Sequence, residues 1–306
     1  MTFTLPRPLG TFAFLVAWLV PWRPAYRVRA AQSGLAFFVH YRDTIGRHIA
    51  KYGTHEPLVT RWLADYLGAA KPGIAIDVGA NLGWHAVHIA RHKNVEMLVA
   101  FEPDPFNAWL LERNLVENGV ENAVVDTRAV SATSGMGRLH RYKSSNFGRH
   151  SLSADYRMGS RAVALTDLDG ALAGLGLADR AISVIKIDVE GHEPAVISGA
   201  SRALERTEAI VLEFSPDLSR DGGLSTDDMV ATLQAMGFTP FRLRSNGGTV
   251  RIDADELRSL KGTLDIIWLR AGRMSPELAR AMNEKDRGTL TIDQAANQNR
   301  LVVKPI

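Results

Sequence analysis

Three apolar, strand-like runs of the sequence end in an acidic residue, and each acid is followed by a turn. Asp77 lies near the end of "GIAIDVG", Glu102 near the end of "EMLVAFEP" and Asp188 near the end of "AISVIKIDVE". In open α/β sheets, ligands bind at the carboxyl ends of the strands. The three carboxylates are therefore expected at one ligand-binding edge, where a carboxylate can bind a cation, accept hydrogen bonds from hydroxyls or remove a proton.

The turn after Asp77 reads Val-Gly-Ala-Asn-Leu-Gly and places Gly79 and Gly83 four residues apart. Gly79 allows a tight turn and a close approach to a ligand, and Gly83 allows close packing of the helix that follows. A phosphate-binding P-loop is excluded because no Gly-Lys-Ser/Thr follows. The G-x-G-x-x-G dinucleotide pattern is also absent, and the carboxylate of Asp77 would repel a pyrophosphate. The turn instead favours a ligand with an ammonium or sulfonium group.

Glu102 follows Gly83 by 19 residues. An acid at the end of the second strand can accept both hydroxyls of a ribose, as in dinucleotide-binding folds. A cationic group at the first turn together with a ribose at the second strand describes S-adenosylmethionine (SAM). The alternative is an ordinary α/β turn with an acid at the surface.

The segment "IKIDVEGHEPAVISGA" carries a second set of polar residues, Asp188, Glu190 and His192, at the end of another strand. Acid-rich loops on the ligand edge are candidate general-base or metal sites. In the alternative interpretation, Glu190 and Glu193 only favour the start of the next helix, and His192 is solvated.

These loops need a parallel sheet to position them, and the sequence predicts one. Apolar runs alternate with helical patterns from about residue 74, which is typical of an α/β protein. Strands are expected at 73–79, 96–103, 122–130, 181–190 and 209–216, with "FTPFRL" and "TLDIIWLR" as later strands and a hairpin formed by "MGRLHRY" and "SRAVALTDL". Helices are expected at 84–92, 105–118, 194–205 and 226–236. The predicted organisation is a mainly helical N-terminal cap (1–70), one catalytic domain (71–272) and a C-terminal tail (273–306).

Composition limits the function classes. The chain has 306 residues, a net charge of +3 and no cysteine, which excludes disulfides, thiolate nucleophiles and Cys-ligated zinc. No basic stripe interleaved with aromatic residues is present, so nucleic acid is not an expected partner. A cytoplasmic location fits the absence of cysteine.

An uncharged run, "LGTFAFLVAWLVPW" (residues 9–22), precedes the predicted domain. It is shorter than the roughly 20 residues of a spanning helix. Its flanking tryptophans and arginines suit a membrane interface, so peripheral membrane contact is one expectation. A buried packing segment and a signal or anchor are the alternatives.

Taken together, "IDVGANLGWHAVHIA", "FEPDPFNAWLLERNLVENG", "ALTDLDGAL" and "IKIDVEGHEPAVISGA" resemble the FkbM family of SAM-dependent methyltransferases. The resemblance implies a class I (Rossmann-like) α/β fold with a seven-stranded, mostly parallel sheet, one antiparallel strand and helices on both faces. It also implies O-methylation, often of sugars or related natural products. Carried onto this chain, the resemblance implies that the methionine end of SAM is bound by Asp77, Gly79, Asn81 and Gly83. The ribose would be bound by Glu102, and the adenine would lie by the strand end at Ala129.

Methyl transfer to a hydroxyl requires alignment and the removal of a proton. The candidate bases are Asp188, Glu190 and His192. Alternatively, Asp188 and Glu213 end adjacent strands and share a Mg²⁺ ion that acidifies the hydroxyl. His85 faces either the acceptor or the packed interior. The polar segment at 143–157 and the N-terminal cap are expected to face the acceptor.

The sequence therefore predicts a SAM-dependent O-methyltransferase that acts on a small-molecule or glycan hydroxyl. An NAD-type oxidoreductase and a non-catalytic SAM-fold module at a membrane are the alternatives.

Overall fold

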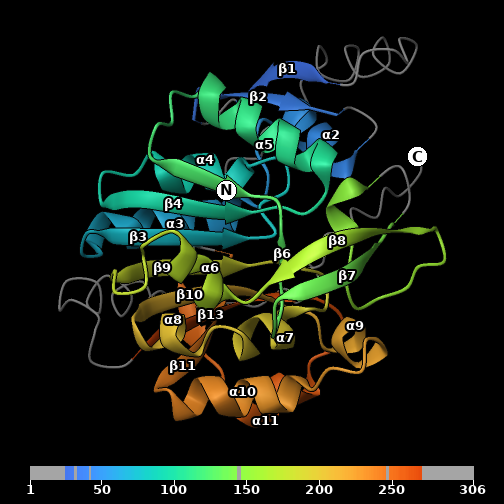
Figure 1. The fold of residues 1–306 in the computed structure, drawn as a ribbon. Coiled ribbons are helices and arrows are strands. Elements are labelled where there is room, and N and C mark those ends of the chain that lie inside the picture. Colours follow the sequence, from blue (N-terminus) through green and yellow to red (C-terminus); the bar gives the residue numbers. More distant parts are fainter. Residues whose placement is uncertain (1–24, 31–32, 41–42, 143–145, 246–247, 271–306) are drawn as a thin grey trace, which may run out of the picture.

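The computed structural model describes residues 25–30, 33–40, 43–142, 146–245 and 248–270 (Figure 1). The apolar run 9–22 and the tail 273–306 lie outside these residues. No helix in the described part of the chain is both long enough and apolar enough to cross a membrane.

The centre of the molecule is an eight-stranded sheet in the order β12-β11-β13-β10-β9-β3-β4-β5. Neighbours from β10 to β5 pair in parallel, whereas β13 is antiparallel to both β10 and β11. The predicted mostly parallel sheet is confirmed, with one short edge strand, β12, beyond the seven expected. The strands are β3 (Gly73–Val78), β4 (Val95–Phe101), β5 (Ala123–Asp126), β9 (Ile182–Ile187), β10 (Thr207–Phe214), β11 (Phe238–Leu243), β12 (Thr249–Arg251) and β13 (Leu264–Arg270).

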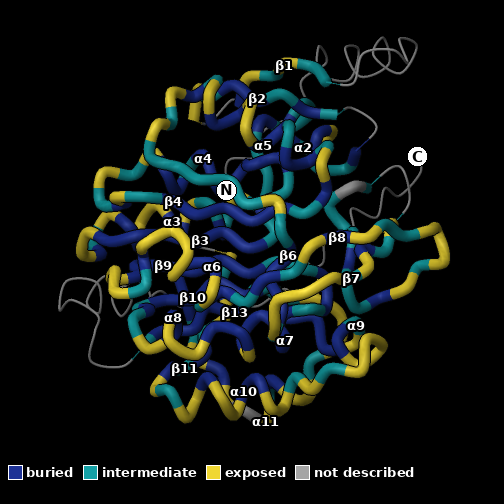
Figure 2. Tube along the Cα trace, in the orientation of Figure 1, coloured by how far each residue is buried: buried dark blue, intermediate teal, exposed yellow. Residues whose placement is uncertain are grey.

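Helices cover both faces of this sheet, which leaves its strands among the most buried parts of the chain (Figure 2). One face packs against α3, α4 and α5, and the other against α6, α7, α8, α10 and α11. The helices are α2 (Thr44–Tyr52), α3 (Pro57–Ala69), α4 (Trp84–Ala90), α5 (Pro105–Glu117), α6 (Leu168–Gly174), α7 (Glu193–Ser198), α8 (Ser201–Glu205), α9 (Pro216–Asp221), α10 (Thr226–Ala235) and α11 (Ala254–Ser259).

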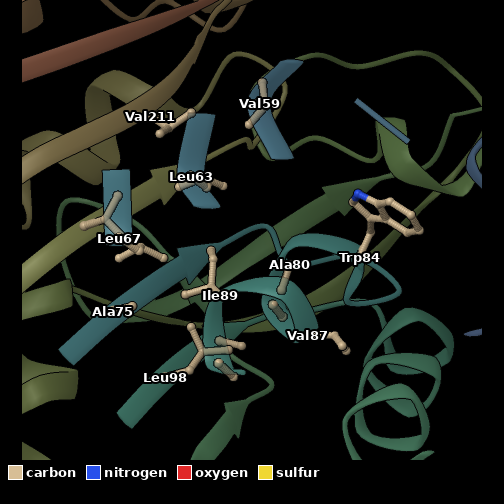
Figure 3. Packing of buried hydrophobic residues seen from close by; sticks show 14 of the residues in the cluster. Val59, Leu63, Leu67, Ala75, Ala80, Trp84, Val87, Ile89, Leu98 and Val211 are labelled. Atoms are coloured by element: carbon tan, nitrogen blue, oxygen red, sulfur yellow. The ribbon is translucent and has the colours of Figure 1, made fainter. Parts of the chain in front are cut away.

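The two faces follow from the period of two along each strand. In β3, Ile74, Ile76 and Val78 point to the second face, whereas Ala75 belongs to the first. Val59, Leu63 and Leu67 of α3 pack on that first face, with α4 beside them (Figure 3). Asp77 follows Ala75 with the same period, so an acid lies at the end of an otherwise apolar, helix-covered face.

The described part of the N-terminal cap contains a β-hairpin in addition to helices. Strands β1 (Tyr26–Arg29) and β2 (Ala36–Val39) form an antiparallel hairpin, followed by α2 and α3. Two asparagine side chains of α5 complete the edge of β2. Asn114 bonds both the N–H (2.6 Å) and the carbonyl (3.0 Å) of Phe38, and Asn118 does the same for Ala36. These bonds attach the cap to the sheet domain.

Two predicted elements are each split in the structure. The strand expected at 122–130 becomes β5 and the separate two-residue β6 (Ala129–Val130), because Asp126 accepts hydrogen bonds from the backbone and guanidinium of Arg128 and forms a turn. The helix expected at 194–205 divides into α7 and α8 at Gly199, where a Cβ would lie 2.2 Å from the carbonyl oxygen of Ser131. The predicted hairpin is confirmed as β7 (Gly135–His140) and β8 (Ser160–Thr166), and these two strands form a small sheet with β6.

Candidate active site

The loop between β3 and α4 contains three residues in left-handed backbone conformations: Gly79, Asn81 and Gly83, with φ of 81°, 52° and 90°. The N–H groups of Gly79 and Ala80 both donate to the carbonyl of Phe101 at 3.0 Å, which fixes the loop to the end of β4. A Cβ on Gly79 would lie 1.9 Å from the carbonyl oxygen of Asp188. The glycine is therefore required for contact between the two predicted loops as well as for the turn.

Asp77 lies immediately before this loop and is completely buried. Neither carboxylate oxygen accepts a hydrogen bond, and the nearest cation, Lys186 Nζ, lies 3.7 Å from Oδ1. Burial raises the pKa of Asp77 to about 6; Lys186 opposes this effect, whereas Asp188 and Glu56 add to it. A buried carboxylate without hydrogen bonds is costly, and a bound ammonium would supply the missing donors.

The carboxylate of Glu102 is held by two backbone N–H groups, one from the loop after β3 and one from the loop after β4. Its Oε2 accepts from the N–H of Asn81 and its Oε1 from the N–H of Asp104, each at 2.8 Å. Burial raises the pKa of Glu102 to about 8. Each oxygen keeps a lone pair, so the carboxylate can also accept a pair of ribose hydroxyls. The orphaned oxygens of Asp77, the fixed carboxylate of Glu102 and the glycine turn together fit SAM.

Lys186 is the central residue that the sequence analysis missed. It projects from β9 onto the same face as Asp77, opposite which it lies in register, and its side chain is 5% exposed. Its ammonium donates to Asp188 Oδ2 at 3.0 Å. Burial opposes its charge, but Asp188, Asp77 and Glu56 outweigh burial and raise the pKa of Lys186 above its usual range. The sequence does contain a signal for this residue: a lysine inside an apolar strand, two residues before an acid.

The loop after β9 is strained and polar. Glu190 and Gly191 have φ of 49° and 94°, and Glu193 Oε1 accepts from the N–H of Gly191 at 2.9 Å. Burial, together with the charge of Asp188, raises the pKa of Glu190 to about 7. Arg149 Nε approaches Glu190 Oε2 at 3.3 Å. Asp188 itself is more accessible, with 27% of its side chain exposed, so it is the member of the predicted trio that is open to an acceptor.

His192 joins three parts of the site. Its Nε2 contacts Ser131 Oγ at 3.0 Å and its Nδ1 contacts Ser153 Oγ at 2.8 Å. Burial lowers the pKa of His192 to about 4, so the ring is neutral near pH 7. Ser131 directly follows β6, the strand that contains Ala129, and Ser153 belongs to the 143–157 segment. With both nitrogens engaged, His192 connects the predicted adenine side to that segment.

Residues 146–157, the described part of the 143–157 segment, reach the loop between β3 and α4, which we call the cofactor loop because it is the predicted SAM-binding turn. A Cβ on Gly148 would lie 2.8 Å from Asn81 Nδ2, and Ser151 Oγ donates to the carbonyl of Glu190 at 2.7 Å. The hydroxyl of Tyr156 is buried without a partner, and the charges of Glu190 and Glu213 act on it. The segment therefore connects the cofactor loop with the loop after β9.

His85 faces the N-terminal cap. Its Nε2 lies 2.8 Å from Glu56 Oε2, the ring is 5% exposed, and burial lowers its pKa to about 4. Burial alone would raise the pKa of Glu56, but His55, His85 and Lys186 outweigh it and lower the pKa. The structure thus places His85 in the packed contact between α4 and the start of α3.

The predicted magnesium site does not fit the residues present. Asp188 and Glu213 do lie at neighbouring strand ends, but no group of three or more His, Asp or Glu residues in the described ranges could hold a metal ion. The Lys186 ammonium bonded to Asp188 already supplies the positive charge at that acid.

A parallel α/β sheet with a glycine turn, a buried acid without hydrogen bonds at the first strand end and an acid at the second strand end defines a class I SAM-dependent methyltransferase. The family described as "Methyltransferase FkbM domain" matches residues 77–240, more than half of the chain. The chain belongs to this family, as the sequence motifs predicted.

Individual relatives are more distant. The chain is 28% identical over 147 residues to the hexuronic acid methyltransferase AglP of Haloferax volcanii; this match covers 48% of the chain and 57% of AglP. Among solved structures, TYW2 of M. jannaschii in complex with AdoMet matches with a TM-score of 0.38 and 11% identity, over 81% of this chain and 87% of TYW2. Precorrin-6y C5,15-methyltransferase of Geobacter metallireducens matches with a TM-score of 0.35 and 14% identity, over 71% of this chain and 92% of that protein.

Proposed function

We propose that the chain transfers the methyl group of SAM to a hydroxyl of a saccharide. The observation that carries this proposal is the contact of the cofactor loop with the loop after β9: a Cβ on Gly79 would lie 1.9 Å from the carbonyl oxygen of Asp188. Lys186 Nζ lies 3.0 Å from Asp188 Oδ2 and 3.7 Å from Asp77 Oδ1, so the accessible carboxylate of Asp188 lies close to the acid that precedes the cofactor loop. The hexuronic acid methyltransferase relative supports a sugar acceptor.

One set of residues binds the methyl donor, and another acts on the acceptor hydroxyl. Asp77 and the turn to Gly83 hold the methionine end of SAM, and Glu102 holds the ribose. When bound, SAM supplies a sulfonium-activated methyl group for in-line transfer to oxygen. Asp188 accepts the proton of the attacking hydroxyl, and Lys186 Nζ, 3.0 Å from Oδ2, orients that carboxylate. Glu190 and His192 hold the surrounding loop and the 143–157 segment.

The test is a transfer assay with tritiated-methyl SAM against cell-envelope glycan extracts, with and without EDTA. We expect label in a saccharide fraction and no effect of EDTA, since the residues do not fit a metal. SAM binding without transfer to any glycan pool would instead support the alternative of a non-catalytic module. Loss of transfer with EDTA, restored by Mg²⁺, would contradict the metal-free arrangement.

A further inference from the structure

Glu56, the residue before α3, has a backbone conformation that its place in the sequence does not favour. Its φ of 41° and ψ of 61° lie in the left-handed region, which is uncommon for residues other than glycine. A residue that precedes a proline, as Glu56 precedes Pro57, also prefers an extended backbone. The Glu56 side chain makes no capping bond to α3. Such strain persists only where the surroundings impose it, and it is concentrated at functional sites, so the contacts of the carboxylate indicate what the strain maintains.

The carboxylate of Glu56 determines which nitrogen of His85 carries the proton. Glu56 Oε2 lies 2.8 Å from His85 Nε2, and Oε1 lies 3.3 Å from His55 Nε2. The ring of His85 is neutral near pH 7, because burial lowers its pKa to about 4, and a neutral imidazole has one N–H. Since an ionised carboxylate can only accept, that N–H is on Nε2. His85 Nδ1 is therefore a hydrogen-bond acceptor.

This acceptor has no donor in the fold. His85 Nδ1 is buried, and within the described part of the chain no hydrogen-bond partner reaches it. Only 5% of His85 is exposed. A buried acceptor without a donor is destabilising, and in a native structure it calls for a bound species or a functional role.

His85 lies beside the proposed methionine end of the SAM site. It is the second residue of α4 and follows Gly83, the last glycine of the cofactor loop, by two positions. The charge of Glu56 acts on both Asp77 and Lys186, near the ends of β3 and β9. The start of α3 thus brings an anion, and α4 a buried acceptor, to the place where the ligand is positively charged. An ammonium has the N–H donors and the positive charge that match both.

We infer that His85 Nδ1 accepts a hydrogen bond from the α-ammonium of SAM, and that Glu56 is the positioning residue that fixes the tautomer of His85 and adds negative charge. Glu56 lies outside residues 77–240, which match the family, so the N-terminal cap completes the cofactor site. The inference rests on SAM as the methyl donor of the proposed function and does not depend on the acceptor. The strained backbone of Glu56 then maintains a binding contact.

Three ligands that differ only in the methionine tail provide the test. They are S-adenosylhomocysteine, its decarboxylated form, which keeps the amine, and methylthioadenosine, which has neither amine nor carboxylate. Dissociation constants are measured by calorimetry. For His85→Phe we expect the two amine-bearing ligands to bind about tenfold more weakly, because a hydrogen bond to a charged group is lost, and methylthioadenosine to bind with unchanged affinity. Glu56→Gln removes the charge but keeps an acceptor for His85, so it should cause a smaller loss of the same kind.

Two substitutions nearby provide matched controls. His88→Phe removes the ring nitrogens of another partly buried histidine of α4, and Glu112→Gln removes an exposed charge from α5. Neither should change the affinity for the amine-bearing ligands relative to methylthioadenosine. The unchanged affinity for methylthioadenosine also shows that the adenosine part of the site remains folded in each variant.

The outcomes separate this inference from the proposed function. An equal loss for all three ligands would show that His85 and Glu56 only support the fold and would overturn the inference. Unchanged affinities, or a loss confined to the ligand with a carboxylate, would place the ammonium elsewhere and would overturn it as well. The expected pattern without methyl transfer to any saccharide would sustain the inference and contradict the proposed function. Transfer to a saccharide with unchanged affinities in both variants would do the reverse.

Discussion

The proposed cofactor side of the site is held by backbone groups, whereas the proposed acceptor side is held by side chains. Gly79, Ala80 and Asn81 bond through their N–H groups to the end of β4 and to Glu102. On the acceptor side, the side chain of His192 bonds that of Ser153, and the side chain of Arg149 pairs with that of Glu190.

This difference separates what a fold provides from what a particular enzyme adds. Backbone geometry at strand ends depends on glycine positions and on one acid per strand, so many sequences of the class can build it. Side-chain networks depend on the identity of each residue and can change without disturbing the sheet. Substitutions on the two sides should therefore have separable effects, on SAM binding and on acceptor turnover.

The largest effect is expected from Asp188→Asn. A general base contributes about 10²- to 10⁴-fold to the rate, so kcat should fall by a factor in that range while SAM affinity stays within about threefold, because Asp188 does not hold the cofactor. Calorimetry with SAM and the tritium assay give the two quantities. Asp179→Asn, an exposed acid before the other end of β9, is the control. A parallel loss of SAM binding would show that the two sides are not separable.

Gly79→Ala should impair both SAM binding and acceptor turnover, because Gly79 is where the loop after β3 contacts the loop after β9. The new Cβ would meet the Asp188 carbonyl at 1.9 Å in a backbone conformation with φ of 81°. Strain of this kind costs about 1–3 kcal/mol, and overpacking adds about 1–3 kcal/mol. Gly119→Ala isolates the first contribution, because Gly119 has φ of 64° and open space around it. Chemical denaturation should show the larger loss for Gly79→Ala; equal losses would refute the close contact.

Asp77→Asn should weaken SAM binding yet stabilise the fold near neutral pH. The folded-state pKa of Asp77, about 6, exceeds its ordinary value of 3.8. Its contribution to stability is therefore fully present below about pH 4 and is lost as the pH rises through about 6. The loss amounts to about 3 kcal/mol at 1.36 kcal/mol per pH unit. Lys186, Asp188 and Glu56 are the charged groups that act on it.

The measurement is the free energy of unfolding from pH 4 to pH 7.5. The advantage of Asp77→Asn over the wild type should be up to about 3 kcal/mol at pH 7 and should vanish toward pH 4. Asp65→Asn, an exposed acid on α3, should show no such dependence. An advantage that grows on acidification would have the wrong sign and would mean that the charge of Lys186 outweighs the effect of burial on Asp77.

Much of the cofactor side could be predicted from the sequence because its signals are local. Asp77, Gly79 and Gly83 lie within seven residues, and Glu102 ends the next apolar run. The alternation that marks each buried strand also gives the parallel sheet. The β1–β2 hairpin was missed because its strands have only four residues each and depend on two asparagines of α5, which are distant in sequence.

The acceptor side could be predicted only in part, because its contacts depend on register. The contact of Lys186 with Asp77 requires the pairing of β9 with β3, and that of Glu213 with Asp265 requires an antiparallel neighbour from the end of the domain. No local pattern specifies either pairing. For the same reason the bonds of His192 to Ser131 and Ser153, which come from segments distant in sequence, could not be predicted; its role as a base stays a prediction.

The smallest effect, and the finest test of the side-chain network, is expected from Ser153→Ala. The substitution removes the hydroxyl at 2.8 Å from His192 Nδ1, and loss of one such bond costs about 1 kcal/mol. Because Ser153 anchors the 143–157 segment and does not touch the cofactor loop, KM for the acceptor should rise about fivefold, while kcat and SAM affinity stay unchanged. Ser160→Ala, which loses an exposed bond from Arg138 at 3.1 Å, should leave KM as it is. If Ser153→Ala lowered kcat and left KM intact, His192 would act in the chemistry itself, and the division between a positioning histidine and a catalytic Asp188 would have to be reversed.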